Sequence, residues 1–250
     1  GDISSIAASL DTVVVVVLNA AQTQSVLFGD DGIVPRMKRG ACVIACATMA
    51  PDFAKELAGR CESHGVHYLD APISGGSVKA GTGQLSVMAA GTEAAFTAAA
   101  PALDGMAEKV FKLGDEPGPG SVMKSINQLL AGVHIAAMGE AMTFGIKQGI
   151  APEQILEVIS QSAGNSWMFS NRAPHLIEGD YTPHSAVDIW LKDLGIVLDV
   201  AKQEKIPAPL TAAALQQYVA ASSIGLGRED DAAVAKVYAR NANIKLPGTL

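Results

Sequence analysis

Blocks of continuous apolar residues alternate with blocks of helical periodicity over the first half of the chain. Residues 12–18 read TVVVVVL, a β-branched run that is apolar on both faces and typical of an interior strand in a parallel sheet covered by helices. Similar runs predict strands at 41–48, 66–70, 85–89 and 109–113, and the intervening segments predict helices at 22–28, 51–63 and 93–106. This alternation predicts an α/β fold built on a parallel sheet.

The second half has a different pattern, because no segment after residue 114 shows the periodicity of a strand. The string DEPGPG at 115–120 predicts a hinge, and apolar residues at spacings of three and four predict one long helix over 121–148. Further helices are expected at 152–162, 185–204, 210–225 and 230–239. We therefore predict an α/β domain over 1–116 and an all-helical domain over 117–250, with the long helix crossing between them.

A dinucleotide-binding sheet ordinarily begins with a strand, a glycine-rich turn and a helix whose N-terminus holds the pyrophosphate. No such unit opens this chain, and its nearest glycine pair, Gly118 and Gly120, follows the sheet instead of starting it. We therefore expect Gly1 to be an interior position of a longer protein. The residue that distinguishes NAD from NADP is then expected to precede Gly1.

Composition narrows the classes of function. The 250 residues carry 25 acidic and 18 basic side chains, a formal charge of −7, and no basic cluster long enough to follow a phosphate backbone, which argues against a nucleic-acid partner. The longest strongly apolar run spans 13–18, far below the roughly 20 residues that cross a bilayer, so we expect a soluble, cytoplasmic protein without a membrane partner. The three cysteines (Cys42, Cys46 and Cys61) are expected to be reduced and buried, and the His64 and His67 pair lacks a third ligand, so no metal site is assigned.

Candidate chemistry begins with DAPISGG at 70–76, where a predicted strand ends. Ser74, Gly75 and Gly76 offer a hydroxyl and side-chain-free backbone N–H groups that can approach an anion such as a carboxylate. From local composition alone, a Gly-Gly turn that merely joins two elements is the stronger interpretation.

The long helix carries a polar stripe among apolar neighbours. Lys124 lies one turn after Gly120 and one turn before Gln128, with Asn127 beside them. If this stripe faces a cleft, Lys124 can exchange a proton with a substrate oxygen while the two amides fix a neighbouring hydroxyl. The alternative is a solvated lysine. Two other segments have no decisive signal. GNSWMFSNR at 164–172 is interpreted as a loop that either lines a substrate or connects helices. KD at 192–193 is compatible with a plain surface pair.

Four blocks in this order resemble the β-hydroxyacid dehydrogenase family: VVVVVLNAAQT at 13–23, DAPISGGSVKAGTGQLSVMAAG at 70–91, GPGSVMKSINQ at 118–128 and WLKDLG at 190–195. The resemblance spans essentially the whole chain. It implies an N-terminally incomplete Rossmann-type dinucleotide-binding domain followed by a helical domain, and an enzyme that transfers a hydride between NAD or NADP, with NAD favoured, and a small hydroxy acid. It also implies a homodimer or homotetramer.

Carried over position by position, the resemblance implies a role for each matching residue. Lys124 is the catalytic lysine. A lysine of ordinary pKa, about 10.4, is protonated at neutral pH and cannot accept a proton there, so Lys124 needs a lowered pKa or acts mainly as a donor in the reverse reaction. The expected substrate ligands are Ser74, Gly75, Gly76, Asn127 and Gln128, and the expected cofactor ligands are Leu18, Asn19, Thr48 and Lys192.

The number of amide and hydroxyl side chains favours a polyhydroxylated substrate. Asn127, Gln128, Asn165, Ser166 and Asn171 are candidates to bind its hydroxyls, and buried polar groups discriminate against substrates that leave them unpaired. The blocks at 163–172 and 179–195 are most similar to members that oxidise a four-carbon sugar acid of the L-threonate type. Alternatives are members that act on 3-hydroxyisobutyrate or tartronate semialdehyde, or a catalytically silent helical assembly module.

Overall fold

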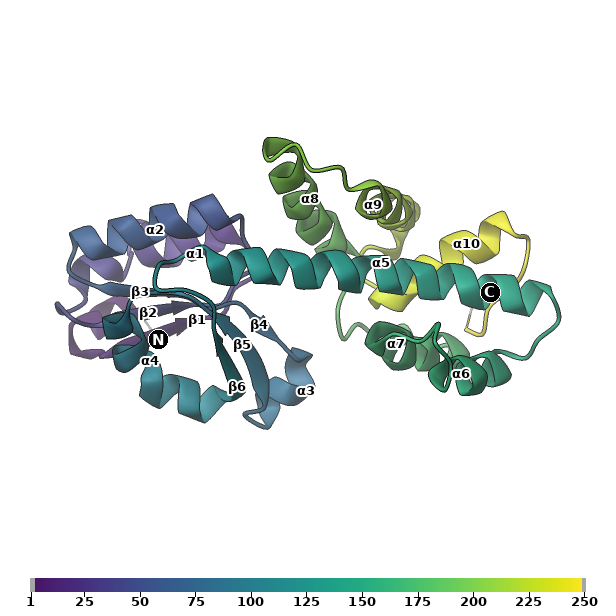
Figure 1. Cartoon of the computed structure of the whole chain (residues 1–250), viewed down its shortest axis with the longest axis horizontal. Helices are drawn as coiled ribbons and strands as arrows, with labels where there is room; N and C mark the ends of the chain where they lie inside the picture. The colour runs from purple at the N-terminus through teal and green to yellow at the C-terminus, as the bar shows by residue number, and fades with distance from the viewer. Residues whose placement is uncertain (1–2, 249–250) are drawn as a thin grey trace. The chain divides into compact units, whose positions relative to one another are not determined.

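The computed structural model describes residues 3–248 and separates the chain into two compact units, Gly1–Ile126 and Asn127–Leu250. The first unit contains all the strands, and the second is helical (Figure 1). One helix, α5, contributes residues to both units. Each unit is described in turn.

The first sheet is parallel, with strand order β1-β2-β3. Its strands are β1 (Thr12–Val15), β2 (Cys42–Ala45) and β3 (His67–Asp70), in a register that pairs Thr12 with Cys42 and Cys42 with His67. Alternate residues of β2 enter opposite cores. Val43 packs with α1 (Ala20–Phe28) and α2 (Pro51–Ser63), and Ile44 packs with α4 (Glu93–Met106), so helices cover both faces (Figure 1).

The second sheet continues from the end of the first. β4 (Ile73–Ser74) pairs antiparallel with β5 (Leu85–Ala89), which pairs parallel with β6 (Ala107–Lys112). An isolated bridge between Asp70 and Ala90 joins the two sheets, and the short helix α3 (Gly76–Gly81) follows β4. These pairings place residues 70–74 alongside β5, with Asp70 opposite Ala90 after its end and Ser74 opposite Ser86 near its start.

The strand predicted at 12–18 is shorter than expected, and within the described residues it has a neighbour on one side alone. The strand ends at Val15 and pairs with β2 alone, and the Val16 side chain is 63% exposed. Val13 and Val15 are buried against the helices, whereas Val14 on the opposite face is partly exposed. A run of valines reports β-propensity and apolarity, and it does not report how many neighbours a strand has.

The long helix begins earlier than expected. α5 spans Pro119–Lys147, so the last two residues of the expected hinge at 115–120 belong to the helix. Proline is well suited to a first helical position, because its missing N–H has no intrahelical partner there. Within the described residues α5 is the one helix long and apolar enough to cross a membrane by length and composition, a criterion that core helices of globular domains also meet.

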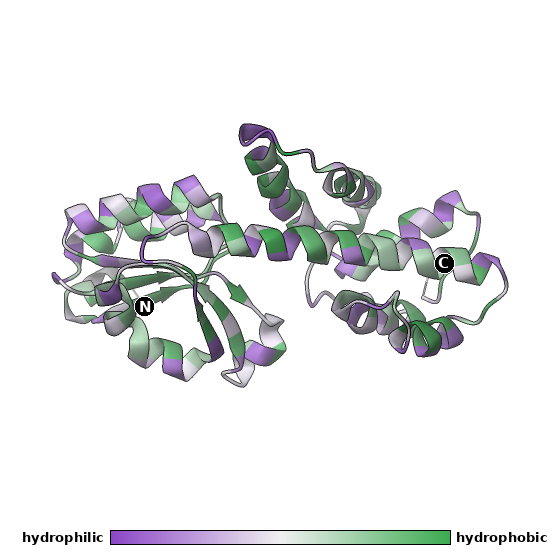
Figure 2. Cartoon of the chain, viewed as in Figure 1, coloured by the Kyte–Doolittle hydropathy of each residue, from purple (hydrophilic) through white to green (hydrophobic). Residues whose placement is uncertain are grey.

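The second unit is built from helices, and an isolated bridge between Ala186 and Asp230 is its one β contact in the described residues. Ile135, Met138 and Met142 of α5 lie in its core. The hydropathy colouring shows apolar positions along α5 and on the helices of this unit (Figure 2). These helices are α6 (Pro152–Ser160), α7 (Trp167–Glu178), α8 (Val187–Gln203), α9 (Pro209–Ala221) and α10 (Ala235–Asn241), with a π-helical turn at Ser222–Leu226 and a 3-10 turn at Asp231–Val234.

Residues 167–172 form the start of α7, so the prediction of a loop over 164–172 was wrong for this part. Ser166 caps the helix, because its side-chain oxygen accepts a hydrogen bond of 3.0 Å from the backbone N–H of Phe169. Phe169, Ala173 and Leu176 then bury one face at helical spacing. Serine followed by such a stripe is the signal of a helix start, and the small and amide residues around it obscured that signal.

Candidate active site

The glycine pair after β4 is a turn of unusual backbone conformation. Gly75 has a φ of +131° and Gly76 a φ of +66°, values that residues with a side chain rarely adopt. A Cβ on Gly75 would also lie 2.7 Å from the Cβ of Lys79. The turn therefore requires glycine, and it leaves the backbone of Gly76 exposed to solvent.

Lys124 reaches this turn. Its side chain is only 9% exposed, and Nζ donates a hydrogen bond of 2.8 Å to the carbonyl oxygen of Ile73, the residue before Ser74. The alternative of a solvated lysine is therefore wrong. Two sequence blocks 51 positions apart meet here, so a cation and the Ser74-Gly75-Gly76 turn lie in one place within the first unit.

Asp70 fixes the helix that carries the lysine, and the sequence analysis did not single it out. Its Oδ2 accepts from the backbone N–H groups of Gly118 (2.9 Å) and Ser121 (2.8 Å), and its Oδ1 accepts from the Ser121 hydroxyl at 2.7 Å. Burial raises the pKa of this carboxyl, and the hydrogen bonds from Ser121 and the backbone act in the opposite direction. A carboxylate at a helix N-terminus also complements the helix dipole.

A second polar cluster lies in the second unit, on α5 and α8. Asn127 Nδ2 donates to Gln128 Oε1 at 2.9 Å, and Gln128 Nε2 donates to Asp193 Oδ2 at 2.5 Å. Lys192 Nζ donates to the other carboxylate oxygen of Asp193, also at 2.5 Å. Asp193 is 2% exposed, so the expectation of a surface pair was wrong. Its position on the buried stripe of Trp190, Leu194 and Val197 is the sequence signal that identifies it.

The expected cofactor residues of the first unit follow parallel strands. Leu18 and Asn19 come after β1, and Thr48 comes after β2, so these loops leave the same edge of the sheet. Asn19 caps α1 by accepting a hydrogen bond of 2.8 Å from the backbone N–H of Gln22, and the Leu18 side chain is 53% exposed.

The remaining polar candidates on the second unit already bind their neighbours. Ser166 caps α7, Asn165 accepts from the Ser170 hydroxyl at 2.9 Å, and Asn171 contacts the Arg172 guanidinium. Arg172 Nε in turn donates to Asp231 at 2.5 Å. These contacts give the three side chains structural partners.

The cysteines are free and buried, as predicted. Burial raises the pKa of each thiol to about 12. Over residues 3–248 no cluster of three or more histidine, cysteine or acidic side chains is arranged to hold a metal ion.

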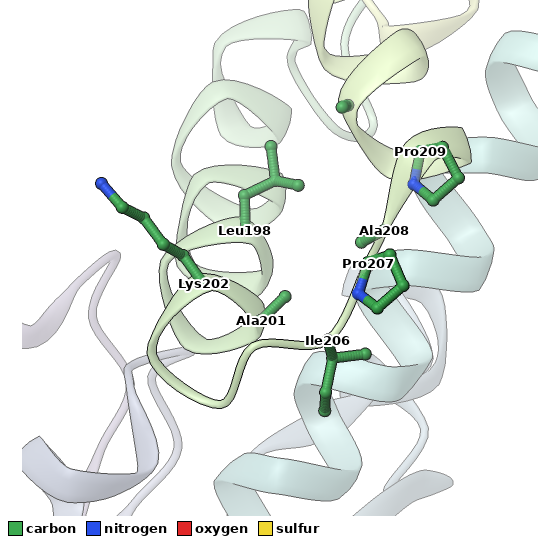
Figure 3. A pocket seen from close by; sticks show the side chains of 8 residues that line it. Leu198, Ala201, Lys202, Ile206, Pro207, Ala208 and Pro209 are labelled. Atoms are coloured by element: carbon green, nitrogen blue, oxygen red, sulfur yellow. The ribbon is translucent and has the colours of Figure 1, made fainter.

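A hollow of about 400 Å³ lies between the end of α8 and the start of α9 in the second unit (Figure 3). Its walls are apolar, and Lys202 is its one charged side chain. A hydroxy acid needs several hydrogen-bonding groups, so this hollow does not suit one. Its lining consists of Leu198, Ala201, Lys202, Ile206, Pro207, Ala208, Pro209 and Ala212.

Comparison with known proteins decides the family. Residues 1–114 match the NAD-binding domain of 6-phosphogluconate dehydrogenase, and residues 118–238 match the NAD-binding family of NADP-dependent 3-hydroxyisobutyrate dehydrogenase. An L-threonate dehydrogenase of Cupriavidus necator is 50% identical over 95% of this chain and 79% of its own length. The chain belongs to the β-hydroxyacid dehydrogenase family.

Other members of the β-hydroxyacid dehydrogenase family agree in sequence and in fold. The L-threonate dehydrogenase of Escherichia coli K12 is 48% identical over 98% of this chain and 80% of its own length. A crystal structure from Salmonella typhimurium, described as a 3-hydroxyisobutyrate dehydrogenase, superposes with a TM-score of 0.90 at 48% identity, covering 94% of this chain and 82% of that one. The predicted combination of a Rossmann-type domain with a helical C-terminal domain is confirmed, as is the prediction of an NAD(P)-dependent dehydrogenase.

Proposed function

We propose that the protein oxidises a four-carbon sugar acid, with L-threonate as the first substrate to test, and that Lys124 exchanges the proton of the reacting hydroxyl. The observation that carries this proposal is the hydrogen bond of 2.8 Å between Lys124 Nζ and the Ile73 carbonyl, which brings the ammonium beside the Ser74-Gly75-Gly76 turn. The names of the relatives at 48–50% identity support the choice of substrate.

The turn at Ser74, Gly75 and Gly76 is proposed to hold the substrate carboxylate. Its hydroxyl and backbone N–H groups are donors, as a carboxylate requires. Gly75 and Gly76 have no side chain that would separate a ligand from the backbone. Their positive φ values disfavour any residue that has one. Lys124 then lies close to the carbon next to the carboxylate, where the reacting hydroxyl is found in a 2-hydroxy acid.

Lys124 moves one proton in each direction of the reaction. In oxidation, its neutral amine accepts the hydroxyl proton at Nζ; in reduction, its ammonium returns that proton to the carbonyl oxygen. A nicotinamide cofactor, when bound, accepts or supplies the two electrons together with the other hydrogen. Asp70 has no direct part in this exchange, and it holds the start of α5 so that Lys124 reaches the turn.

The cofactor residues are proposed to be Leu18, Asn19 and Thr48 in the first unit and Lys192 in the second. We propose NAD ahead of NADP as the physiological cofactor. A cytoplasmic location and a homodimer or homotetramer built through the helical unit complete the proposal. The large apolar side chains of Phe144, Trp167 and Leu210 are exposed on that unit, and their burial between subunits would favour self-association.

The experiment measures kcat/KM of the full-length protein for L-threonate, D-glycerate and 3-hydroxyisobutyrate, with NAD and NADP in turn. We expect L-threonate to be the best substrate. Equal or better use of 3-hydroxyisobutyrate would favour the second candidate function, which the Salmonella typhimurium structure described above supports.

The role of Lys124 is tested with Lys124→Ala. Removal of a general acid or base lowers turnover about 100-fold or more, and cofactor affinity should be almost unchanged. Lys38→Ala, at an exposed lysine of the same unit that pairs with Asp11, is the matched control, and it should leave kcat unchanged. An unaltered kcat in Lys124→Ala would remove this lysine from the reaction.

A further inference from the structure

The side chain of Lys79 lies against the Gly75-Gly76 turn. A Cβ added to Gly75 would lie 2.7 Å from Lys79 Cβ, 3.2 Å from its Cγ and 2.8 Å from its Cδ, so the aliphatic stem of the lysine runs across Gly75. Gly76 is open by comparison, because an added Cβ there would meet nothing within 4 Å among the described residues. A ligand that approaches the backbone of Gly76 therefore arrives beside the stem of Lys79.

The ammonium of Lys79 has only a loose partner, Glu108 on β6. Nζ lies 3.5 Å from Glu108 Oε2, and the two side chains are 44% and 60% exposed. This distance is longer than that of an ordinary hydrogen bond, and exposed ion pairs contribute little to stability. Lys79 can therefore leave Glu108 at a small cost in free energy by rotation of its flexible stem.

An irregularity in the pairing of β5 with β6 brings Glu108 to this place. The register jumps by one residue between Leu85 and Ser86, so Glu108 has no partner on β5. Ser86 is also the residue of β5 that pairs with Ser74 on the other side. Such an irregularity changes the direction in which a side chain points, and it occurs here at the residue of β5 that lies opposite the turn.

We propose that Lys79 is a substrate-binding residue whose ammonium pairs with the carboxylate held by the turn at Ser74, Gly75 and Gly76, and that Glu108 holds this ammonium when the turn is empty. This inference rests on the proposed function, because it takes the turn as the carboxylate site. The hydroxyl and N–H donors of the turn carry no net charge. An ammonium beside them supplies the counter-charge of an ionised acid.

The two partners of this ion pair then act on substrate binding in opposite directions. Loss of the Lys79 ammonium removes the counter-charge of the bound substrate. Loss of the Glu108 carboxylate frees the ammonium and removes a negative charge that repels the substrate. An ion pair that serves the fold alone has a different signature, because either loss then changes stability slightly and leaves KM unaltered.

The experiment measures KM and kcat of the full-length protein for L-threonate. In Lys79→Met we expect KM to rise about tenfold, the lower limit for a hydrogen bond to a charged group, because the site is exposed. The change in kcat should be the smaller one, and Lys79→Arg should restore most of the affinity. In Glu108→Gln we expect KM to fall about two- to fivefold.

Salt supplies a second readout. Between ionic strengths of about 0.01 M and about 0.1 M the Debye length falls from about 30 Å to about 10 Å, so KM of the wild-type protein should rise over this range. The rise should be smaller in Lys79→Met, which lacks one of the charges that attract the substrate.

The matched control is an exposed ion pair of the same unit, Lys38 with Asp11, at 2.5 Å. Asp11 directly precedes β1, so this pair lies at the edge of the sheet where β1 begins, whereas the turn follows the edge where β3 ends. Lys38→Met and Asp11→Asn should leave KM and its salt dependence unchanged. All variants should keep the thermal midpoint of the wild-type protein to within a few degrees, since exposed pairs contribute little to stability.

An unchanged KM in Lys79→Met would overturn the proposal, and so would a KM that rises in Glu108→Gln as it does in Lys79→Met. Ser74→Ala separates this outcome from a failure of the carboxylate site. A raised KM in Ser74→Ala with an unchanged KM in Lys79→Met would reject the role of Lys79 alone, and an unchanged KM in both would reject the site as well. If another hydroxy acid is the better substrate, the same constants are measured with that acid, because the carboxylate is common to the whole class.

Discussion

Gly120 lies where α5 leaves the sheet, and its replacement by alanine should disturb both stability and catalysis. An added Cβ would lie 2.5 Å from the carbonyl oxygens of Asp70 and Met88 and 3.0 Å from Asp70 Oδ2. Carbon and oxygen atoms in contact are about 3.3–3.6 Å apart, so the helix must move by about 1 Å away from β3 and β5. Backbone atoms on both strands cannot rotate away as a flexible side chain would.

The magnitude follows from three contributions. Forcing one methyl group into a packed site costs about 1–3 kcal/mol, and weakening the hydrogen bonds to the Asp70 carboxylate costs about 1.5–3 kcal/mol. The higher helix propensity of alanine returns about 1 kcal/mol at most. The net expectation for Gly120→Ala is a loss of roughly 1.5–5 kcal/mol in the free energy of unfolding.

Urea unfolding followed by circular dichroism measures this loss, and Gly59→Ala is the matched control. Gly59 lies within α2 of the same unit, and nothing is found within 4 Å of its added Cβ, so alanine there should stabilise by about 0.5–1 kcal/mol. Because Lys124 is carried on the same helix, kcat should fall in Gly120→Ala and stay unchanged in Gly59→Ala. Equal unfolding curves for the two variants would refute the close approach of α5 to the strands.

Three further predictions concern single groups. Burial raises the pKa of Asp70 above its ordinary value of 3.8. A raised carboxyl pKa stabilises the native protein while the carboxyl is protonated, and this stabilisation is lost as pH rises from 3.8 through the raised pKa. The difference in unfolding free energy between wild type and Asp70→Asn should therefore shrink over that pH range. Urea titrations across this range check it, and a difference that grows with pH would mean that the hydrogen bonds from Ser121 outweigh burial. Ser166→Ala should destabilise by about 1 kcal/mol through loss of the α7 cap, whereas Ser166→Asp should retain most of the wild-type stability in the same assay. All three cysteines should stay unreactive toward an aromatic disulfide reagent until the protein is denatured, since the thiols are buried with pKa values of about 12; reaction in the native state would contradict their burial.

Elements with strong local signals were predicted to the residue. The expected helices at 51–63 and 93–106 and the strand at 85–89 coincide with α2, α4 and β5. Proline at the first position of α2 and a Thr92 side chain that caps α4 mark helix starts in the sequence itself. The short elements β4 and α3 were not predicted, because two strand residues and six helical residues are too few to show a period.

The same distinction between local and distant signals applies to the residues of the candidate site. Six candidate residues were singled out from motifs, because glycines and polar residues stand out against apolar neighbours in a sequence. They are Ser74, Gly75, Gly76, Lys124, Asn127 and Gln128. Asp70 was not named, and Asp193 was interpreted only as part of a surface pair, because the role of each depends on a partner far away in the chain: Asp70 binds Ser121, and Asp193 binds Gln128, 65 positions away. A buried acid reveals its purpose only through the donors that surround it.

The two missed carboxylates have a common physical role. Each is buried, and each accepts hydrogen bonds from α5: Asp70 from the first turn of the helix and Asp193 from Gln128. A buried carboxylate is strongly disfavoured without its donors, so each constrains the part of α5 that it contacts more tightly than apolar packing alone. Lys124 lies on α5 between these two attachment points. A reacting group must be held to within a fraction of an ångström, and within the first unit the hydrogen bonds between Asp70 and Ser121, three residues before the lysine, supply that constraint.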